Sequence, residues 1–260
     1  MTNPKSALVT GASAGIGKEF AMRLAAQGYS VTCVARRKDT LNALVQELPG
    51  QGHVVLCADL SSDEDVARVA ACLQDQPVNL LVNNAGFSVL EPFFESPLER
   101  QQNILQVNCA AVVTLAHAFL QQAKPGDALI NVASVVTYLP TPAQPMYSAS
   151  KAFIGALSEC LWDEHRGRGV YVMGLCPGVT QTDFIKTATG GESDGENLPA
   201  ALTQTSGQVV SEAMAALEKR KKAIVVTGWV NRMMLLMPRL LTRHRLIKTL
   251  AVIGDPDNAL

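Results

Sequence analysis

The sequence lacks the cysteine patterns that cross-link a protein or bind a metal. Its six cysteines are scattered, with no Cys-x-x-Cys pair and no cluster with histidine at metal-ligand spacing. Four of them stand inside apolar runs, a placement typical of buried free thiols in a reducing compartment. We therefore expect neither disulfide bonds nor a bound metal ion.

Long hydrophobic runs, repeats and interdomain linkers are also missing. The first residues, MTNPKSALVTG, hold one lysine and a short apolar run, which fits neither a signal peptide nor a membrane anchor. Hydrophobic residues make up 48% of the 260 residues and charged residues 17%, as in an ordinary globular protein. We expect one cytoplasmic domain spanning residues 1–260, and no nucleic-acid partner.

Short apolar runs recur along the chain and alternate with segments of helix length. The helical segments show apolar residues at a period of 3.6, whereas the short runs are continuously apolar, as in strands buried on both faces. This alternation predicts an α/β fold of the Rossmann type, a doubly wound parallel sheet of about seven strands with helices on both faces. The predicted strands are residues 6–10, 30–35, 53–58, 79–83, 128–133, 170–176 and 223–228.

A glycine-rich turn, TGASAGIG, follows the first predicted strand and leads into a helical pattern. Gly11, Gly15 and Gly17 let the backbone approach a ligand, and the helix N-terminus offers amides and a positive dipole to a pyrophosphate. The second strand ends with VARRK, so Ala35 stands where an acidic residue would select NAD. Arg36 and Arg37 follow it and favour a 2′-phosphate, so we predict NADP(H) as the cofactor.

The pentapeptide YSASK places a phenol four residues before an ammonium group. On a helix, Tyr147 and Lys151 would project from one face, where a nearby cation lowers the pKa of a phenol. Together with other motifs in order, this pair resembles the short-chain dehydrogenase/reductase family over nearly the whole chain. The motifs are TGxxxGxG at 10–17, Asp59, NNAG at 83–86, Asn108, Ser134, YxxxK at 147–151 and Pro177-Gly178.

The resemblance implies four catalytic residues. Tyr147 would be the general acid in carbonyl reduction, and Lys151 would bind the nicotinamide ribose and lower the pKa of Tyr147. Ser134 would bind the substrate oxygen. Asn108 would hold a water molecule that links Lys151 to solvent; taken without the family, it is a polar helix residue that satisfies a neighbouring backbone group.

The resemblance also implies a cofactor site at the carboxyl ends of the strands. One departure stands out, since many members that prefer NADP carry a basic residue where this chain has Ala14, so some use of NADH stays open. The predicted cofactor residues are Gly11, Ser13, Gly15, Ile16, Gly17, Arg36, Arg37, Asp59, Leu60, Asn84, Ala85, Gly86, Tyr147, Lys151, Pro177, Gly178 and Thr182.

Three segments, 87–94, 135–146 and 179–186, are expected to cover the nicotinamide. They are mostly apolar, so a hydrophobic ketone or aldehyde, or the secondary alcohol in reverse, is the expected substrate. A 3-oxoacyl thioester is the alternative, and a non-catalytic NADP(H)-binding protein is a further one. Residues 187–201 are polar and glycine-rich, which predicts a mobile substrate loop. The apolar residues named for the pocket are Phe87, Val89, Leu90, Val136, Tyr138, Leu139, Met146 and Phe184.

Residues 219–254 carry nine basic residues and no acidic one, and 229–254 reads as a basic amphipathic segment that Pro238 interrupts. Three roles are open for it: a lid and oligomer contact, a surface lying on an anionic membrane, or a docking site for an acidic carrier protein or CoA ester. The resemblance further implies a homo-dimer or homo-tetramer that forms through residues 97–122 and 147–166.

Overall fold

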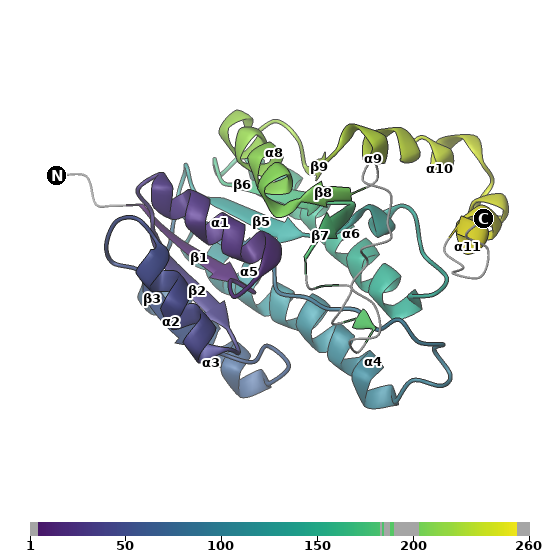
Figure 1. Ribbon diagram of the computed structural model, residues 1–260. Coiled ribbons are helices and arrows are strands. Elements are labelled where there is room, and N and C mark those ends of the chain that lie inside the picture. Colours follow the sequence, from purple (N-terminus) through teal and green to yellow (C-terminus); the bar gives the residue numbers. More distant parts are fainter. Residues whose placement is uncertain (1–4, 183, 185–187, 190–202, 254–260) are drawn as a thin grey trace.

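A seven-stranded parallel sheet forms the centre of the computed structural model (Figure 1), which describes residues 5–182, 184, 188–189 and 203–253. All seven predicted strands are present, which confirms the Rossmann-type α/β fold. In order across the sheet the strands are β3 Val54–Cys57, β2 Ser30–Ala35, β1 Ser6–Thr10, β4 Leu80–Asn83, β5 Ala128–Val132, β6 Tyr171–Cys176 and β9 Ile224–Val226. The strand numbers fall from β3 to β1 and then rise from β4 to β9. Such sheets bind ligands at the point where the order reverses, here between β1 and β4.

Helices cover both faces of the sheet, and successive strand residues alternate between two apolar clusters. Ala7 and Val9 of β1 face one cluster, whereas Leu8 faces the other, as the two-residue period of a strand requires. The helices of the first face are α1 Gly15–Ala26, α2 Lys38–Glu47 and α8 Ser206–Lys219. Those of the second face are α3 Asp63–Asp75, α5 Ala111–Gln122 and α6 Pro145–Arg166.

The predicted helix at 97–122 is one helical run with a widened turn in its middle. Helix α4, Leu98–Leu105, passes into a π-helical turn at Gln106–Ala110 and then into α5. By length and composition the run Leu98–Gln122 could cross a membrane. Its inward face packs on α3 and the sheet, as that of a core helix does.

The structure adds a second, two-stranded parallel sheet that the sequence did not predict. It pairs β7, Val179–Gln181, with β8, Thr203–Thr205, and so joins the two ends of the predicted substrate loop. Both strands are short and mostly polar, which is why no apolar run marked them. The loop itself lies outside the described residues except for 188–189.

Three short helices follow β9 and extend away from the sheet (Figure 1): α9 Trp229–Met234, α10 Met237–Leu240 and α11 Arg243–Ile253. Pro238 stands in the first turn of α10, so the predicted interruption of the helix is confirmed. Strand β9 also separates the nine basic residues. Four of them precede β9 at the amino edge of the sheet, and five follow it at the carboxyl edge, so the residues do not form one basic surface.

Candidate active site

The glycine-rich turn lies between β1 and α1, against the chain that leaves β4. Gly11 has a φ of +66°, and a Cβ there would come within 2.7 Å of Nδ2 of Asn84. That amide donates to the carbonyl oxygen of Thr10 at 2.9 Å. The Thr10 hydroxyl accepts hydrogen bonds from the backbone N–H groups of Asn84 and Ala85. The two motifs are therefore locked together, and Thr10 is a positioning residue that the sequence signalled only as part of the TG motif.

The start of α1 suits a bound anion. Ala14 is its N-cap and makes no capping hydrogen bond, and the first turn contains no acidic residue. The first amides of the helix therefore have no side-chain partner of their own, as at pyrophosphate-binding helix ends. Gly17 packs so closely that a Cβ would lie 2.3 Å from the carbonyl oxygen of Gly11. The turn thus has the tight backbone approach that a dinucleotide phosphate needs.

The two arginines after β2 differ in their surroundings. Arg37 donates to Oγ of Ser13 at 3.1 Å, which ties it to the glycine-rich turn. Arg36 has a 72% exposed side chain, and its Nη1 lies 4.0 Å from Oδ2 of Asp59. The carboxylate close to Arg36 is that of Asp59, which is itself a predicted cofactor residue. Both guanidinium groups lie at the carboxyl edge of β2, as predicted.

Two predicted cofactor residues turn their side chains toward the protein interior. Leu60 is buried in the cluster beneath α3, and Ile16 packs against the cluster beneath α1. Only their backbone groups can face a cofactor. Gly86, by contrast, packs tightly against two of the predicted catalytic residues, since a Cβ there would lie 3.0 Å from Oδ1 of Asn108 and 3.4 Å from Nζ of Lys151.

Ser134 and the Tyr147–Lys151 pair come from β5 and α6. Ser134 directly follows the end of β5 and caps a short 3-10 turn, with its Oγ accepting from the N–H of Val136 at 3.3 Å. Its side chain hydrogen-bonds the Tyr147 phenol. Lys151 is 4% exposed and donates to the carbonyl oxygen of Val132 at 2.8 Å, while its Nζ lies 5.6 Å from the centre of the Tyr147 ring. The structure thus brings together three of the four predicted catalytic residues at the end of β5.

Burial dominates the electrostatics of this pair. It raises the pKa of the Tyr147 phenol to about 12, although the hydrogen bond with Ser134 acts in the opposite direction. Burial also lowers the pKa of Lys151 to about 8. The expected lowering of the Tyr147 pKa by Lys151 is not seen in this structure, where desolvation, which raises the pKa, is the largest cause.

Asn108 lies in the π-helical turn and is 1% exposed. Its Nδ2 donates to the carbonyl oxygen of Phe87 and to Oγ of Ser150, and its Oδ1 accepts from the N–H of Phe87. Ser150 in turn donates to the carbonyl oxygen of Tyr147. The carboxamide therefore connects the loop after β4 to the helix that carries Tyr147, and widened turns of this kind are frequent at functional sites.

The turn after β6 lies against both the glycine-rich turn and α9. A Cβ on Gly15 would meet the Thr182 side chain at 2.8 Å, so this turn lies against the glycine-rich loop. A Cβ on Gly178 would meet Asn231 of α9 at 2.2 Å, and Asn231 is buried and bonded to the carbonyl oxygen of Thr227. No sequence motif marked Asn231, whose side chain packs α9 against the predicted nicotinamide turn.

The apolar residues predicted to cover the nicotinamide divide into two groups. The Phe184 ring lies 5.5 Å from the Tyr147 ring, at an angle of 51°, and so stands at the cleft. Leu139 is instead 3% exposed and packs with Leu246 of α11, and the Tyr138 hydroxyl donates to Glu159. These two residues therefore pack the loops together.

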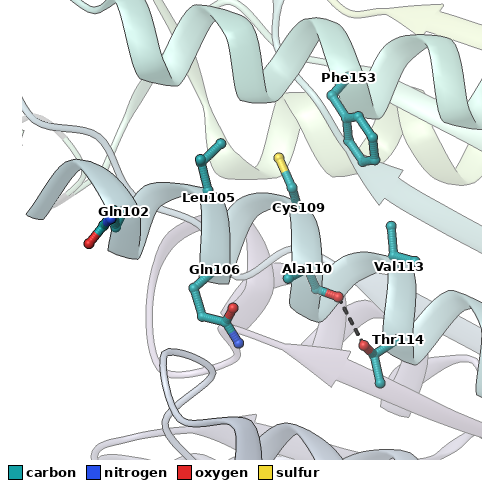
Figure 2. Close-up of a pocket in the computed structure, with 8 residues that line it drawn as sticks. All are labelled: Gln102, Leu105, Gln106, Cys109, Ala110, Val113, Thr114 and Phe153. Carbon is teal, nitrogen blue, oxygen red and sulfur yellow. Dashed lines mark hydrogen bonds between the residues drawn. The ribbon is translucent and has the colours of Figure 1, made fainter. Parts of the chain in front are cut away.

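A shallow groove of about 490 Å³ lies elsewhere, on the outer surface of α4, α5 and α6 (Figure 2). Leu105, Val113 and Phe153 line it with about two fifths of each side chain exposed. None of the predicted catalytic residues lines it. Among the described residues, no group of three metal-ligating side chains was found, and all six cysteines are free thiols.

Known proteins resemble this chain in sequence and in fold. The family model "short chain dehydrogenase" matches residues 5–192. A sulfoacetaldehyde reductase of Chromohalobacter salexigens is 32% identical over 215 residues, which cover 79% of this chain and 85% of that protein. A very-long-chain 3-oxoacyl-CoA reductase of Pyricularia oryzae is 36% identical over 177 residues, 64% of this chain and 53% of that protein.

A solved short-chain dehydrogenase from Sphingobium yanoikuyae, in complex with NADPH, superimposes with a TM-score of 0.81 at 29% identity and covers 94% of this chain and 95% of that one. The chain spans less than two thirds of the length of several curated relatives that it matches. A family match over most of the chain, with the fold to support it, leads to one conclusion. The protein is an oxidoreductase of the short-chain dehydrogenase family, which binds a nicotinamide cofactor.

Proposed function

We propose that this protein is an NADP(H)-dependent reductase of hydrophobic ketones or aldehydes, with the secondary alcohol as the substrate in reverse. The observation that carries the proposal is the meeting of Ser134, Tyr147 and Lys151 at the end of β5, where Gly86 packs closely against Asn108 and Lys151. Bound NADPH supplies the hydride. The protein supplies position, a hydrogen bond and a proton.

The side chains divide the remaining work. The Ser134 hydroxyl donates a hydrogen bond to the substrate oxygen, where negative charge develops during reduction. The Tyr147 phenol gives its proton to that same oxygen. Because burial raises the pKa of Tyr147 to about 12, the phenol is protonated at neutral pH and holds the proton that reduction requires. Lys151 binds the nicotinamide ribose, and Asn108 positions α6 through Ser150.

The preference for NADP(H) follows from the arginines after β2. Arg36 is exposed and free to turn toward a 2′-phosphate, with Asp59 as a competing partner 4.0 Å away. Arg37 is held near the glycine-rich turn by Ser13. A guanidinium group recognises phosphate through paired hydrogen bonds, whereas NAD would offer only a hydroxyl group here. The NADPH complex of the Sphingobium protein supports this preference.

The apolar surroundings of Tyr147 support a hydrophobic substrate. The Phe184 ring lies 5.5 Å from the phenol, and the buried Val89 belongs to the loop that Asn108 holds in place. A 3-oxoacyl thioester is the second candidate, and the similarity to a very-long-chain 3-oxoacyl-CoA reductase favours it. Both candidates present a carbonyl group beside an apolar chain or ring.

The groove on α4, α5 and α6 supports a homo-oligomer, which we include in the proposal. Leu105 and Phe153 expose 43% and 45% of their surface there (Figure 2). An exposed apolar strip can pair with the same strip of a second copy about a two-fold axis, as in homo-dimers. Analytical ultracentrifugation of the purified protein measures whether the mass is that of a dimer or a tetramer.

The test is NADPH oxidation against aromatic ketones, aldehydes, diketones, quinones and 3-oxoacyl thioesters, with the Tyr147→Phe variant run in parallel. We expect turnover of at least one class, and a loss of about 10³-fold in kcat in the variant because no proton donor remains. NADPH binding, followed by the change in its fluorescence, should survive the substitution. An unchanged kcat in the Tyr147→Phe variant would contradict the proposed mechanism.

A further inference from the structure

Helices α9, α10 and α11 form an arm beyond β9 that has its own small apolar cluster (Figure 1). Leu246 and Leu250 of α11 pack there with Leu139, which precedes Tyr147 by eight residues. Met234, Leu235, Met237 and Leu241 cover this cluster from α9 and α10. The apolar residues on the inner side of the arm are therefore packed, and this side lies against the segment between Ser134 and Tyr147.

The outer side of the arm is apolar as well. Trp229 is 73% exposed, Met233 58%, Leu236 42% and Leu240 81%. Their spacing of four, three and four residues is that of one helix face, and Leu235 and Leu236, which separate α9 from α10, keep backbone angles in the helical region. Four large apolar side chains within twelve residues exceed the scattered exposure that is normal at a protein surface.

Cations flank this apolar side. Five basic residues follow β9, and residues 219–254 contain no acidic one. Arg232 forms an ion pair with Glu212 at 2.9 Å. The other four, Arg239, Arg243, Arg245 and Lys248, are exposed and have no carboxylate partner in the part of the chain that the structure describes.

We propose that the arm docks on an anionic membrane surface, with the side chains of Trp229, Met233, Leu236 and Leu240 entering the interface and Arg239 and Arg243 lying at the lipid phosphates. An amphipathic segment with an aromatic residue, aliphatic side chains and flanking arginines has the chemistry of an interfacial anchor. The proposal thereby places an otherwise cytoplasmic protein at the periphery of a membrane.

Two other occupants fit the arm less well. A second copy of the arm would bring arginines against arginines about a two-fold axis, because the segment offers no carboxylate to pair with them. An acidic carrier protein would pair with the cations. It would leave Trp229 and Leu240, which are 73% and 81% exposed, without an apolar partner. A bilayer interface satisfies both kinds of side chain.

The position of the arm gives the docking a consequence that rests on the proposed function. Leu139 joins the arm to the wall that carries Ser134 and Tyr147. A hydrophobic carbonyl compound dissolved in the bilayer would therefore meet the protein on the side of its cleft. Membrane binding itself needs neither cofactor nor turnover, so its failure and the failure of the reductase proposal are separate results.

Vesicle sedimentation tests the proposal with the full-length protein. We expect pelleting with vesicles of phosphatidylcholine and phosphatidylglycerol, weaker pelleting at high salt, and little with phosphatidylcholine alone. The double variant Arg239→Gln/Arg243→Gln should bind about 30-fold more weakly. Its matched control, Lys221→Gln/Lys222→Gln, removes two exposed lysines at the opposite edge of the sheet and should bind like the wild type.

A second pair of variants tests how much the apolar side chains contribute to vesicle binding. Leu240→Gln should weaken vesicle binding about tenfold, because it removes an apolar side chain that would leave water. Met22→Gln changes an exposed apolar side chain on α1 and should have no effect. Neither Leu240 nor Met22 belongs to a described apolar cluster, so both variants should fold.

Tryptophan fluorescence reports the depth of insertion. The chain has two tryptophans, so Trp162→Phe leaves Trp229 as the sole emitter. Its emission should shift to the blue with anionic vesicles and be quenched by brominated lipid. No pelleting and no shift would overturn the proposal. Retention on an immobilised acyl carrier protein without any vesicle binding would also overturn it, in favour of the carrier.

Discussion

Residues 134–151, which carry Ser134, Tyr147 and Lys151 and are called the wall below, lie next to the C-terminal arm. The two regions are built in opposite ways. In the wall, polar side chains are buried and bonded, as Lys151 is to the carbonyl oxygen of Val132. In the arm, apolar side chains such as Trp229 and Leu240 face outward. The wall lies within the residues that the family model matches, whereas the arm lies beyond them.

The two regions are held in place by packing of very different extent. The wall joins β5 to α6, which pack into the large clusters on the sheet, so its geometry is as rigid as the core. The arm is attached through a cluster of three buried leucines and through Asn231 against Gly178. We expect the arm to undock locally at a lower free energy than global unfolding.

A pair of leucine truncations sharpens this contrast. Leu81→Ala in the main core should lower the free energy of unfolding by about 3 to 4 kcal/mol, because the cavity lies in a closed cluster. Leu246→Ala should lower it by only about 1 kcal/mol, since the arm can detach first. Urea denaturation measures both values.

Leu246→Ala should also raise the KM for substrate more than it lowers kcat, because Leu139 beside the cleft loses its support. An equal loss of stability in the two leucine variants would show that the arm unfolds together with the core.

The cofactor end of the cleft offers a second pair of variants. Arg36→Gln should raise the KM for NADPH about tenfold while leaving that for NADH nearly unchanged, since the exposed guanidinium would lose only its contact with the 2′-phosphate. Arg37→Gln should have a smaller effect on the ratio, because Arg37 is bonded to Ser13. Steady-state kinetics with both cofactors measures the ratio, and equal shifts for NADPH and NADH would contradict the assignment of Arg36.

The smallest expected effect tests the buried ammonium of the wall. Burial lowers the pKa of Lys151 from 10.5 to about 8, so the unfolded chain binds more protons than the folded one between these values. The free energy of unfolding should therefore rise with pH in that window, by about 1 kcal/mol between pH 7 and pH 9. Lys151→Met should lack this rise. The comparison of the two proteins cancels the titration of other groups, and parallel pH profiles would disprove the shift.

The strands could be predicted from local sequence, whereas the candidate catalytic residues came from the family resemblance that the motifs carry in order. Each strand is a short, continuous apolar run, because both of its faces are covered by helices. The TGxxxGxG turn and the YxxxK pair also depend on local spacing, in a turn and along one helix. The pairing of β7 with β8 left no such mark, since it joins two short polar segments more than twenty residues apart.

Local sequence was enough to predict the order of strands and helices and the excess of cations near the C-terminus, and the family resemblance pointed to Ser134, Tyr147 and Lys151. The folded arrangement sets how those groups behave. It buried Tyr147 and Lys151 and so shifted both pKa values, and it used Asn108 to join Phe87 to Ser150. It also divided the basic segment at β9. The physical reason is that desolvation and long-range packing depend on residues distant in sequence, which no local pattern contains.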